Sequence, residues 1–248
     1  MQSKTMIFTT MLILATACLV ACKEEVPVTA LDSFISRTEH LQGVALTDSL
    51  RILAQGGAPD NAYANYLLGN QFYETANDSA SRVGWSNVAV VALIDSAEQY
   101  FDLAVSQDST FIEPMVNLGS LWDDRAEQTG TREEREVRLA KAKEFYLLAL
   151  SVDETDEKAR CNLGSLYLRQ RLTGEAMNEF QTVLAQNDRS ALAHYNIAIM
   201  FAEQKIYREA IAEWELAAKY DPTGDIGERS RDNVEIVKDL LNSPEPGQ

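Results

Sequence analysis

The sequence predicts an all-α fold, an α-solenoid of about four helical hairpins with capping helices at both ends. The first observation behind this prediction is a repeat: the pattern that starts at Leu163-Gly164 returns 34 residues later at Ile197-Ala198. The second is that apolar residues recur at helical spacing through most of the chain. The third is the composition, 46% hydrophobic and 24% charged, which is ordinary for a folded repeat protein.

The repeat extends beyond its opening pair of residues. Its first copy continues with Tyr167, Ala176 and Phe180, and its second with Phe201, Ala210, Trp214 and Pro222. This pattern resembles the tetratricopeptide repeat (TPR) family, whose units are antiparallel pairs of helices. The resemblance implies a right-handed superhelix in which the first helix of each pair lines a groove, and a protein that binds other proteins and is not an enzyme.

The N-terminus resembles a bacterial lipoprotein signal. Lys4 precedes an apolar run from Met6 to Ala21, and Leu19-Val20-Ala21-Cys22 matches the lipoprotein cleavage motif. We therefore expect residues 1–21 to be a signal peptide and Cys22 to carry the lipid, with acyl chains such as palmitate. A plain signal peptide that happens to contain a cysteine is the alternative.

The residues after Cys22 bear on where the anchored protein lies. Residues 22–30 are expected to be a lipidated tether. Lys23, rather than the Asp that retains many lipoproteins at the inner membrane, favours the outer membrane, on its periplasmic face or at the cell surface. Lys23-Glu24-Glu25 resembles a short surface-export tag, but the start of a solvated tether explains the same residues equally well.

The remaining chain divides on the 34-residue frame. Residues 31–61 form a degenerate repeat or a capping helical pair, as expected where a solenoid ends and must present one polar side to water. Residues 62–241 form the superhelix, with units at 62–111, 112–156, 157–190 and 191–224 and a capping helix at 225–241. The tail at 242–248 contains two prolines and a glycine and is expected to be disordered.

The first two units are longer than the other two. The first has 16 extra residues, which begin as a polar loop over residues 77–81; the apolar run Val88 to Ile94 then extends the second helix backward. Trp85 is either a binding anchor or a side chain that folds back over the helices. The second unit has 11 extra residues and is expected to be an elongated hairpin, with a capping box from Thr131 to Glu134. Whether the insertions at 74–89 and 123–134 bind anything stays open.

Small residues on the first helices predict close packing within each hairpin. We expect the small residues of the first helices to face alanines of the second helices. Those of the first helices are Gly69, Gly119, Gly164 and Ala198, and the alanines of the second helices are Ala97, Ala142, Ala176 and Ala210. The aromatic positions of both helices, such as Phe101, Tyr146 and Phe180, are expected to fill the space between neighbouring units.

The TPR resemblance also implies which residues line the groove. The predicted partner-binding set is Tyr63, Tyr66, Asn70, Tyr73, Asn117, Ser120, Lys158, Asn162, Ser165, Tyr195 and Asn196. In some TPR superhelices an asparagine at the place of Asn117, Asn162 and Asn196 hydrogen-bonds the backbone of an extended peptide, since a carboxamide both donates and accepts. Asparagine there also belongs to the general TPR pattern. The tyrosines instead indicate an aromatic surface of the kind enriched at protein interfaces.

Charge and composition exclude several function classes. A formal charge of −16 argues against nucleic-acid binding, which needs clustered Lys and Arg. Three cysteines and two histidines without metal-ligand spacing predict no metal and no cofactor. Cys161 and His194 are expected to be packing residues, and no catalytic residue is assigned.

Two functions remain for the sequence. The first is a membrane-anchored TPR scaffold that binds another protein in the bacterial cell envelope, in an assembly or adaptor role. The alternative is a surface-exposed accessory lipoprotein for glycan or nutrient uptake, in which the tyrosines would bind an oligosaccharide.

Overall fold

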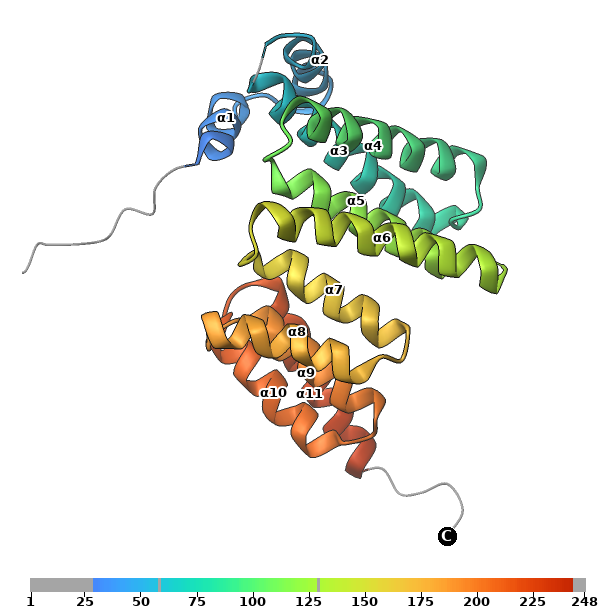
Figure 1. Cartoon of the computed structure of the whole chain (residues 1–248), viewed down its shortest axis with the longest axis vertical. Coiled ribbons are helices and arrows are strands. Elements are labelled where there is room, and N and C mark those ends of the chain that lie inside the picture. Colours follow the sequence, from blue (N-terminus) through green and yellow to red (C-terminus); the bar gives the residue numbers. More distant parts are fainter. Residues whose placement is uncertain (1–28, 58, 129, 243–248) are drawn as a thin grey trace, which may run out of the picture. The chain divides into compact units, whose positions relative to one another are not determined.

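The computed structural model of the chain describes residues 29–57, 59–128 and 130–242, and throughout these residues the regular structure is helical (Figure 1). The predicted signal peptide, residues 22–28 of the tether and residues 243–248 of the tail lie outside the described residues. The helices are α1 (Ala30–Thr38), α2 (Gly43–Ala54), α3 (Asp60–Val83), α4 (Val88–Gln107), α5 (Ile112–Glu127), α6 (Arg132–Val152), α7 (Glu157–Arg169), α8 (Thr173–Gln186), α9 (Ala191–Glu203), α10 (Tyr207–Tyr220) and α11 (Asp225–Asn242).

The chain divides into two compact units, residues Met1–Gln42 and Gly43–Gln248. The first contains α1, which begins at a capping box: the Thr29 side chain accepts from Asp32 N, and the Asp32 carboxylate accepts from Thr29 N. The second contains α2 to α11. The two helices expected over residues 31–61 are therefore present as α1 and α2, but they belong to different units.

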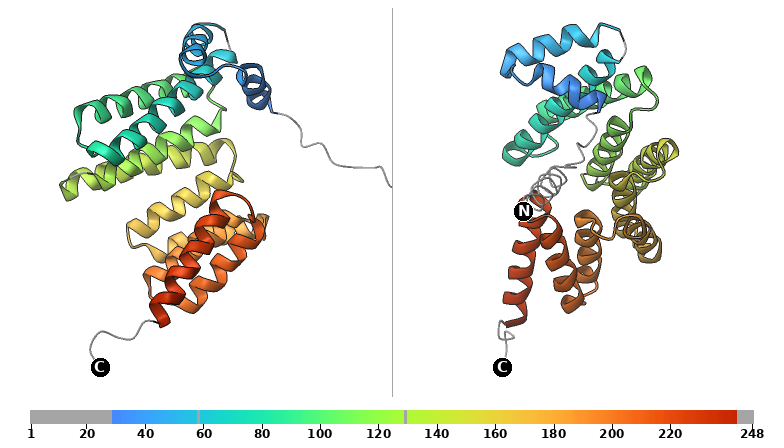
Figure 2. Two further views of the ribbon diagram at one scale, coloured as in Figure 1. Left: turned by 180° about the vertical axis from the view of Figure 1, so that it is seen from behind. Right: turned by 90° about the vertical axis from the view of Figure 1, so that its left-hand side faces the viewer.

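Within the second unit, consecutive helices pack as antiparallel pairs. The pairs are α3 with α4, α5 with α6, α7 with α8, and α9 with α10 (Figure 2). Each pair also contacts the next, and α2 and α11 pack against α3 and α10 respectively. This arrangement confirms the predicted solenoid of four hairpins.

The first two hairpins are elongated, as the insertions predict. Helices α3 and α4 have 24 and 20 residues and α5 and α6 have 16 and 21, whereas α7 to α10 have 13 or 14 each. The predicted backward extension of α4 is confirmed at Val88. The predicted start of the second helix of the next hairpin is confirmed as well, since Thr131 is the N-cap of α6 and its Oγ1 accepts from Glu134 N at 3.2 Å.

The predicted polar loop over residues 77–81 is wrong, because α3 continues without a break to Val83. Ala76 and Ala80 lie one helical turn apart on the buried face of this segment and pack into a cluster with Val90 and Ile94 of α4. Burying that face outweighs the weak helix preference of Asn, Asp and Ser. The loop between the two helices shrinks to residues 84–87.

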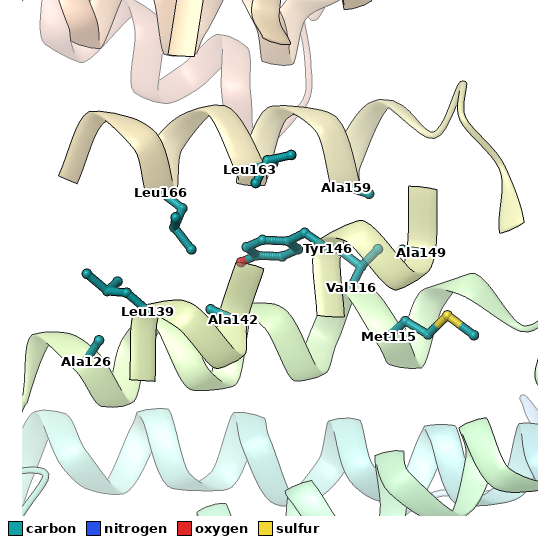
Figure 3. Packing of buried hydrophobic residues seen from close by; sticks show 10 residues of the cluster. All are labelled: Met115, Val116, Ala126, Leu139, Ala142, Tyr146, Ala149, Ala159, Leu163 and Leu166. Carbon is teal, nitrogen blue, oxygen red and sulfur yellow. The ribbon is translucent and has the colours of Figure 1, made fainter. Parts of the chain in front are cut away.

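Large side chains fill the space between neighbouring hairpins. Figure 3 shows the cluster between the second and third, where the Tyr146 ring of α6 lies among Leu163 and Leu166 of α7, Ala142 of α6 and Val116 of α5. Tyr146 is 1% exposed and Leu163 and Leu166 are also buried. Each fully buried side chain of this size stabilises the folded state by about 1.5–3 kcal/mol.

The predicted partners of the first-helix glycines are wrong. A Cβ atom added at Gly119 would lie 2.3 Å from the Tyr146 ring, and one added at Gly69 or Gly164 would lie 2.5 Å from the ring of Phe101 or Phe180. The glycines therefore face aromatic rings of the second helix in their own hairpin, rather than its alanines. An aromatic ring needs a bare backbone to lie this close, so the requirement for a small residue holds while its partner differs.

Helix α11 covers the last hairpin. Val237 is buried and Val234 packs beside it against Ala198, Ala210 and Trp214. Leu241, near the end of the helix, is 52% exposed and lies off this packed face.

Candidate functional site

The predicted groove residues lie on α3, α5, α7 and α9, the first helices of the four hairpins, and we call this surface the first-helix row. Hydrogen bonds connect the row from one hairpin to the next: Asn117 Nδ2 to Asn70 Oδ1 at 2.7 Å, Asn162 Nδ2 to Ser120 Oγ at 3.2 Å, and Ser165 Oγ to Asn196 Oδ1 at 3.0 Å. In each bond the sixth residue of one unit meets the ninth residue of the unit before it. The structure thus joins six of the predicted residues in three separate pairs, one at each junction between neighbouring hairpins.

These bonds give the three asparagines a structural role. Asn196 also donates from Nδ2 to Leu192 O at 3.0 Å, so both ends of its carboxamide are engaged. Asn162 donates to Ser120, while its Oδ1 accepts no hydrogen bond from the residues that the structure describes. Binding of a peptide backbone by this ladder stays a prediction, and Asn162 has the carboxamide best placed to serve it.

The tyrosines at the first hairpin pack against other rings. Tyr63 and Tyr66 each lie 5.1 Å, centroid to centroid, from Phe111, in edge-on geometry. Burial raises the pKa of Tyr66, while hydrogen bonds with Asn70 and Asn117 lower it. Tyr63 is almost fully buried, so a large part of the predicted aromatic surface is used inside the hairpin.

Most residues of the row are half-buried, at its start as well as further along the chain. Lys158 on α7 is the exposed member of the predicted set, and Tyr195 on α9 is half-buried beside Ala198 and Trp214.

Two successive acidic residues of α5, Asp123 and Asp124, lie along the row, and Asp123 occupies a groove-lining place of the repeat frame. Asp123 is 5% exposed, and burial raises its pKa to about 6 against the opposing effect of Arg169. Arg169 Nη1 lies 3.3 Å from Asp123 Oδ1, as an ion pair without hydrogen-bond alignment. The Tyr73 hydroxyl donates to Asp124 Oδ2. The sequence signal of this pair is two successive acidic residues at the twelfth and thirteenth places of α5, within the 13-residue length of α7 and α9.

A pocket of about 450 Å³ lies where the two elongated hairpins end side by side, and we call it the hairpin-tip pocket. Its walls come from the loop after α3, the first turns of α4, the end of α5 and the start of α6. The lining residues are Trp85, Ser86, Val91, Ile94, Asp95, Trp122, Arg125, Gln128 and Arg138. Trp85 folds back and packs against the cluster around Ile94, and it also forms part of the pocket wall.

The two arginines of this pocket differ in their partners. Arg125 lies 4.9 Å above the Trp122 ring, and its guanidinium pairs with Asp95 and, at 2.7 Å, with Glu98. Arg138 donates from Nη1 to Arg125 O at 2.7 Å and has no carboxylate partner among the described residues. The charge of Arg125 is therefore compensated, and that of Arg138 is not.

Cys161 and His194 both have core positions, as predicted. Cys161 is fully buried, and burial raises the pKa of its thiol, which disfavours the reactive thiolate. His194 is 7% exposed, with Nδ1 2.6 Å from Glu213 Oε2 and Nε2 3.2 Å from Asp188 O. It connects α9 to α10 and to the turn that precedes α9.

Metal-ligand clusters and membrane-spanning helices are both absent from the part of the chain that the structure describes. The described residues contain no group of three or more His, Cys, Asp or Glu side chains that could hold a metal ion. None of the helices in residues 29–57, 59–128 and 130–242 is long and apolar enough to cross a membrane.

Comparison with solved structures finds similar helical arrays. TTC0263, a thermophilic TPR protein from Thermus thermophilus, is 16% identical with a TM-score of 0.62, over 83% of this chain and 100% of that chain. A crystal structure of MamA is 14% identical with a TM-score of 0.49, over 78% and 95% of the two chains. The TPR domain of Arabidopsis OM64 is 13% identical with a TM-score of 0.35, over 49% and 98%.

No protein-family model and no curated protein sequence matches the chain. The match to the Thermus protein combines a TM-score of 0.62 with low identity, and it therefore concerns the fold. Together with the 34-residue period and the four stacked hairpins, it shows that the chain has the fold of a tetratricopeptide repeat solenoid.

Proposed function

We propose that this chain is a lipid-anchored scaffold that binds another protein in the bacterial cell envelope. The observation that supports it most is the first-helix row, in which hydrogen bonds between hairpins hold four helices as one prearranged surface. A surface ordered before binding loses little conformational entropy when a partner binds. An extended segment that crosses several hairpins would make repeated contacts along it.

The anchor and the charge add to this proposal. Leu19-Val20-Ala21-Cys22 supports lipid attachment at Cys22, and Lys23 favours the outer membrane. The formal charge of −16 favours a neutral or cationic partner through long-range electrostatics. The glycan alternative has less support, because Tyr63 and Tyr66, on which it depends, pack against Phe111.

A matched pair of variants separates binding from stability in the row. Asn162→Ala with Asn196→Ala removes two carboxamides, and Ser120→Ala with Ser165→Ala removes the same two bonds between hairpins but keeps the carboxamides. Each lost bond costs about 0.5–1.5 kcal/mol, so we expect similar losses of stability in the two variants. Crosslinking in native envelopes followed by affinity capture should lose more of the partner in the asparagine variant than in the serine variant. Equal capture by both variants would remove the asparagine ladder from the proposal.

The anchor has its own test. Cys22→Ala should move the protein from the membrane fraction to the carbonate wash, because the acyl chains are its expected attachment. A variant that stays with the membrane would contradict lipidation at Cys22 and would leave the result for the row unchanged.

A further inference from the structure

The hairpin-tip pocket has the features of a ligand site that the first-helix row does not include. Its volume of about 450 Å³ lies in the range of small-ligand and side-chain pockets. Two indole rings, Trp85 and Trp122, and two aliphatic side chains, Val91 and Ile94, line it. This wall suits an aromatic or large apolar group.

The electrostatics of the pocket select the sign of the ligand. Arg125 has its charge compensated by Asp95 and Glu98, whereas Arg138 has no carboxylate partner in the described chain. A half-buried guanidinium attracts a carboxylate and can hold it with two parallel hydrogen bonds. The pocket therefore places an anion site beside an aromatic site.

The surroundings of the pocket favour a protein segment over a free small molecule. Val83 and Val88 flank the loop that contains Trp85, and they are 57% and 84% exposed; Val91 inside the pocket is 42% exposed. A small aromatic acid would leave the two flanking valines in water. A peptide chain that continues beyond the pocket could cover them.

We propose that the hairpin-tip pocket binds an aromatic side chain and the neighbouring carboxylate of a segment from a partner protein. The aromatic ring packs against Trp85 and the pocket-facing part of Trp122, whose ring already has Arg125 and Lys141 at 4.9 and 3.7 Å from its centroid. The carboxylate pairs with Arg138, and flanking apolar residues cover Val83 and Val88. The proposal rests on the proposed function in that the ligand belongs to a protein, and it adds a second contact, formed by the two insertions, outside the first-helix row.

The test uses the full chain in mild detergent and two peptides that differ in one charge. These are acetyl-Val-Phe-Asp-Val-amide and acetyl-Val-Phe-Asn-Val-amide. The chain has three tryptophans, so the ¹⁵N-labelled indoles of Trp85 and Trp122 report on the pocket while that of Trp214, in α10, is an internal control. We expect the Asp peptide to shift the first two signals and leave the third unchanged. It should bind about fivefold more tightly than the Asn peptide, the factor typical of a partly exposed ion pair.

Variants of the pocket test each contact separately. Arg138→Gln should abolish the preference for the Asp peptide, and Arg138→Lys should retain part of it. Trp85→Ala should weaken both peptides at least fivefold, and Trp85→Phe should restore much of the binding. Arg171→Gln, a change at the turn after α7, is the matched control and should bind as the unmodified chain does.

Several results would overturn the proposal. Equal affinity for the two peptides, or no shift of Trp85 and Trp122, would exclude the predicted recognition. Binding of N-acetylphenylalanine as tight as that of the Asp peptide would assign the pocket to free aromatic acids. Shifts of the two indoles that depend on protein concentration without peptide would assign it to a second copy. None of these results affects capture by the first-helix row, so the two proposals can fail independently.

Discussion

At the residue scale, each of three hairpins has a first-helix glycine that lies against an aromatic ring of its second helix. Gly164 lies against Phe180, and an added Cβ would be 2.5 Å from that ring. The ring is fully buried between α7 and α8 and has little room to move away. Gly69 with Phe101 and Gly119 with Tyr146 repeat the arrangement.

Gly164→Ala should destabilise the protein by about 1–3 kcal/mol, because overpacking exceeds the gain of about 1 kcal/mol in helix propensity. Gly174→Ala is the control in the same hairpin: a Cβ there meets nothing within 4 Å, so only the propensity gain remains. Chemical denaturation followed by circular dichroism measures both. A Gly164→Ala protein as stable as the original would contradict the packing of Phe180 on this glycine.

Two residues of the regular hairpins adopt a left-handed backbone. Arg171 and Lys205 both have φ of 62° and occupy the same place in the turn after the first helix. A residue with a side chain destabilises the folded state by about 1–2 kcal/mol in this conformation. Glycine avoids that cost, but its greater conformational freedom in the unfolded chain reduces the free energy of unfolding by about 0.4–1 kcal/mol. Arg171→Gly should therefore stabilise the protein by about 0.5 kcal/mol, with Lys205→Gly adding the same. A loss of stability in either variant would show that the Arg or Lys side chain makes a stabilising contact.

At the scale of elements, α5 and α7 meet at the pair of Asp123 and Arg169. Burial is the largest influence on Asp123, raising its pKa to about 6, and Asp124 and Glu127 add to this while Arg169 and Arg135 oppose it. The same carboxyl in the unfolded chain has a pKa of about 3.9. The folded state therefore binds the proton more tightly, and this group contributes stability that is complete below about pH 4 and lost as the pH rises through about 6.

Asp123→Asn removes this dependence, since the amide does not titrate. Between pH 4 and pH 8, the free energy of unfolding of the variant should rise by about 2 kcal/mol relative to that of the original protein. This figure follows from the difference between the folded and unfolded pKa values of Asp123, reduced because solvent screens the charge. Urea denaturation at a series of pH values gives the difference. A difference that is flat or falls with pH would contradict a raised pKa at Asp123.

The helices also show which parts of the fold could be predicted from the sequence and why other parts could not. The 34-residue period placed α5 to α10 correctly, because each repeat buries the same apolar positions. It missed the continuation of α3 through residues 77–81, since the local preferences of Asn, Asp and Ser oppose a helix there and only packing of Ala76 and Ala80 on α4 favours it. Helix propensity describes an isolated segment, whereas residues 77–81 are helical because the segment packs against α4.

The candidate sites divide in the same way. The first-helix row could be predicted, because the repeat register fixes which residues share a face. The hydrogen bonds of the row could not be predicted. They join the sixth residue of one unit to the ninth residue of the unit before it, and the sequence does not give the distance between neighbouring units. The hairpin-tip pocket combines Trp85 from a loop with Arg138 from a helix that follows much later, and only the pairing of two elongated hairpins brings them together.

At the scale of the whole molecule, the proposed binding surface and the expected anchor lie in different parts of the chain. The row comprises residues of α3 to α9, and the expected lipid attaches at Cys22, before the described residues. Under the proposed function, such a division would let the solenoid hold a partner while the acyl chains fix its location.

The measurement that tests the central claim most directly is site-specific photo-crosslinking in native envelopes. A photoreactive phenylalanine at Lys158 or Tyr195 places the probe on the first-helix row, and the same residue at Glu144, exposed on α6, is the control on a second helix. A scaffold that binds a protein through the row predicts one discrete crosslinked partner from the two row positions and none from Glu144. No product from either row position, or the same products from all three, would contradict it.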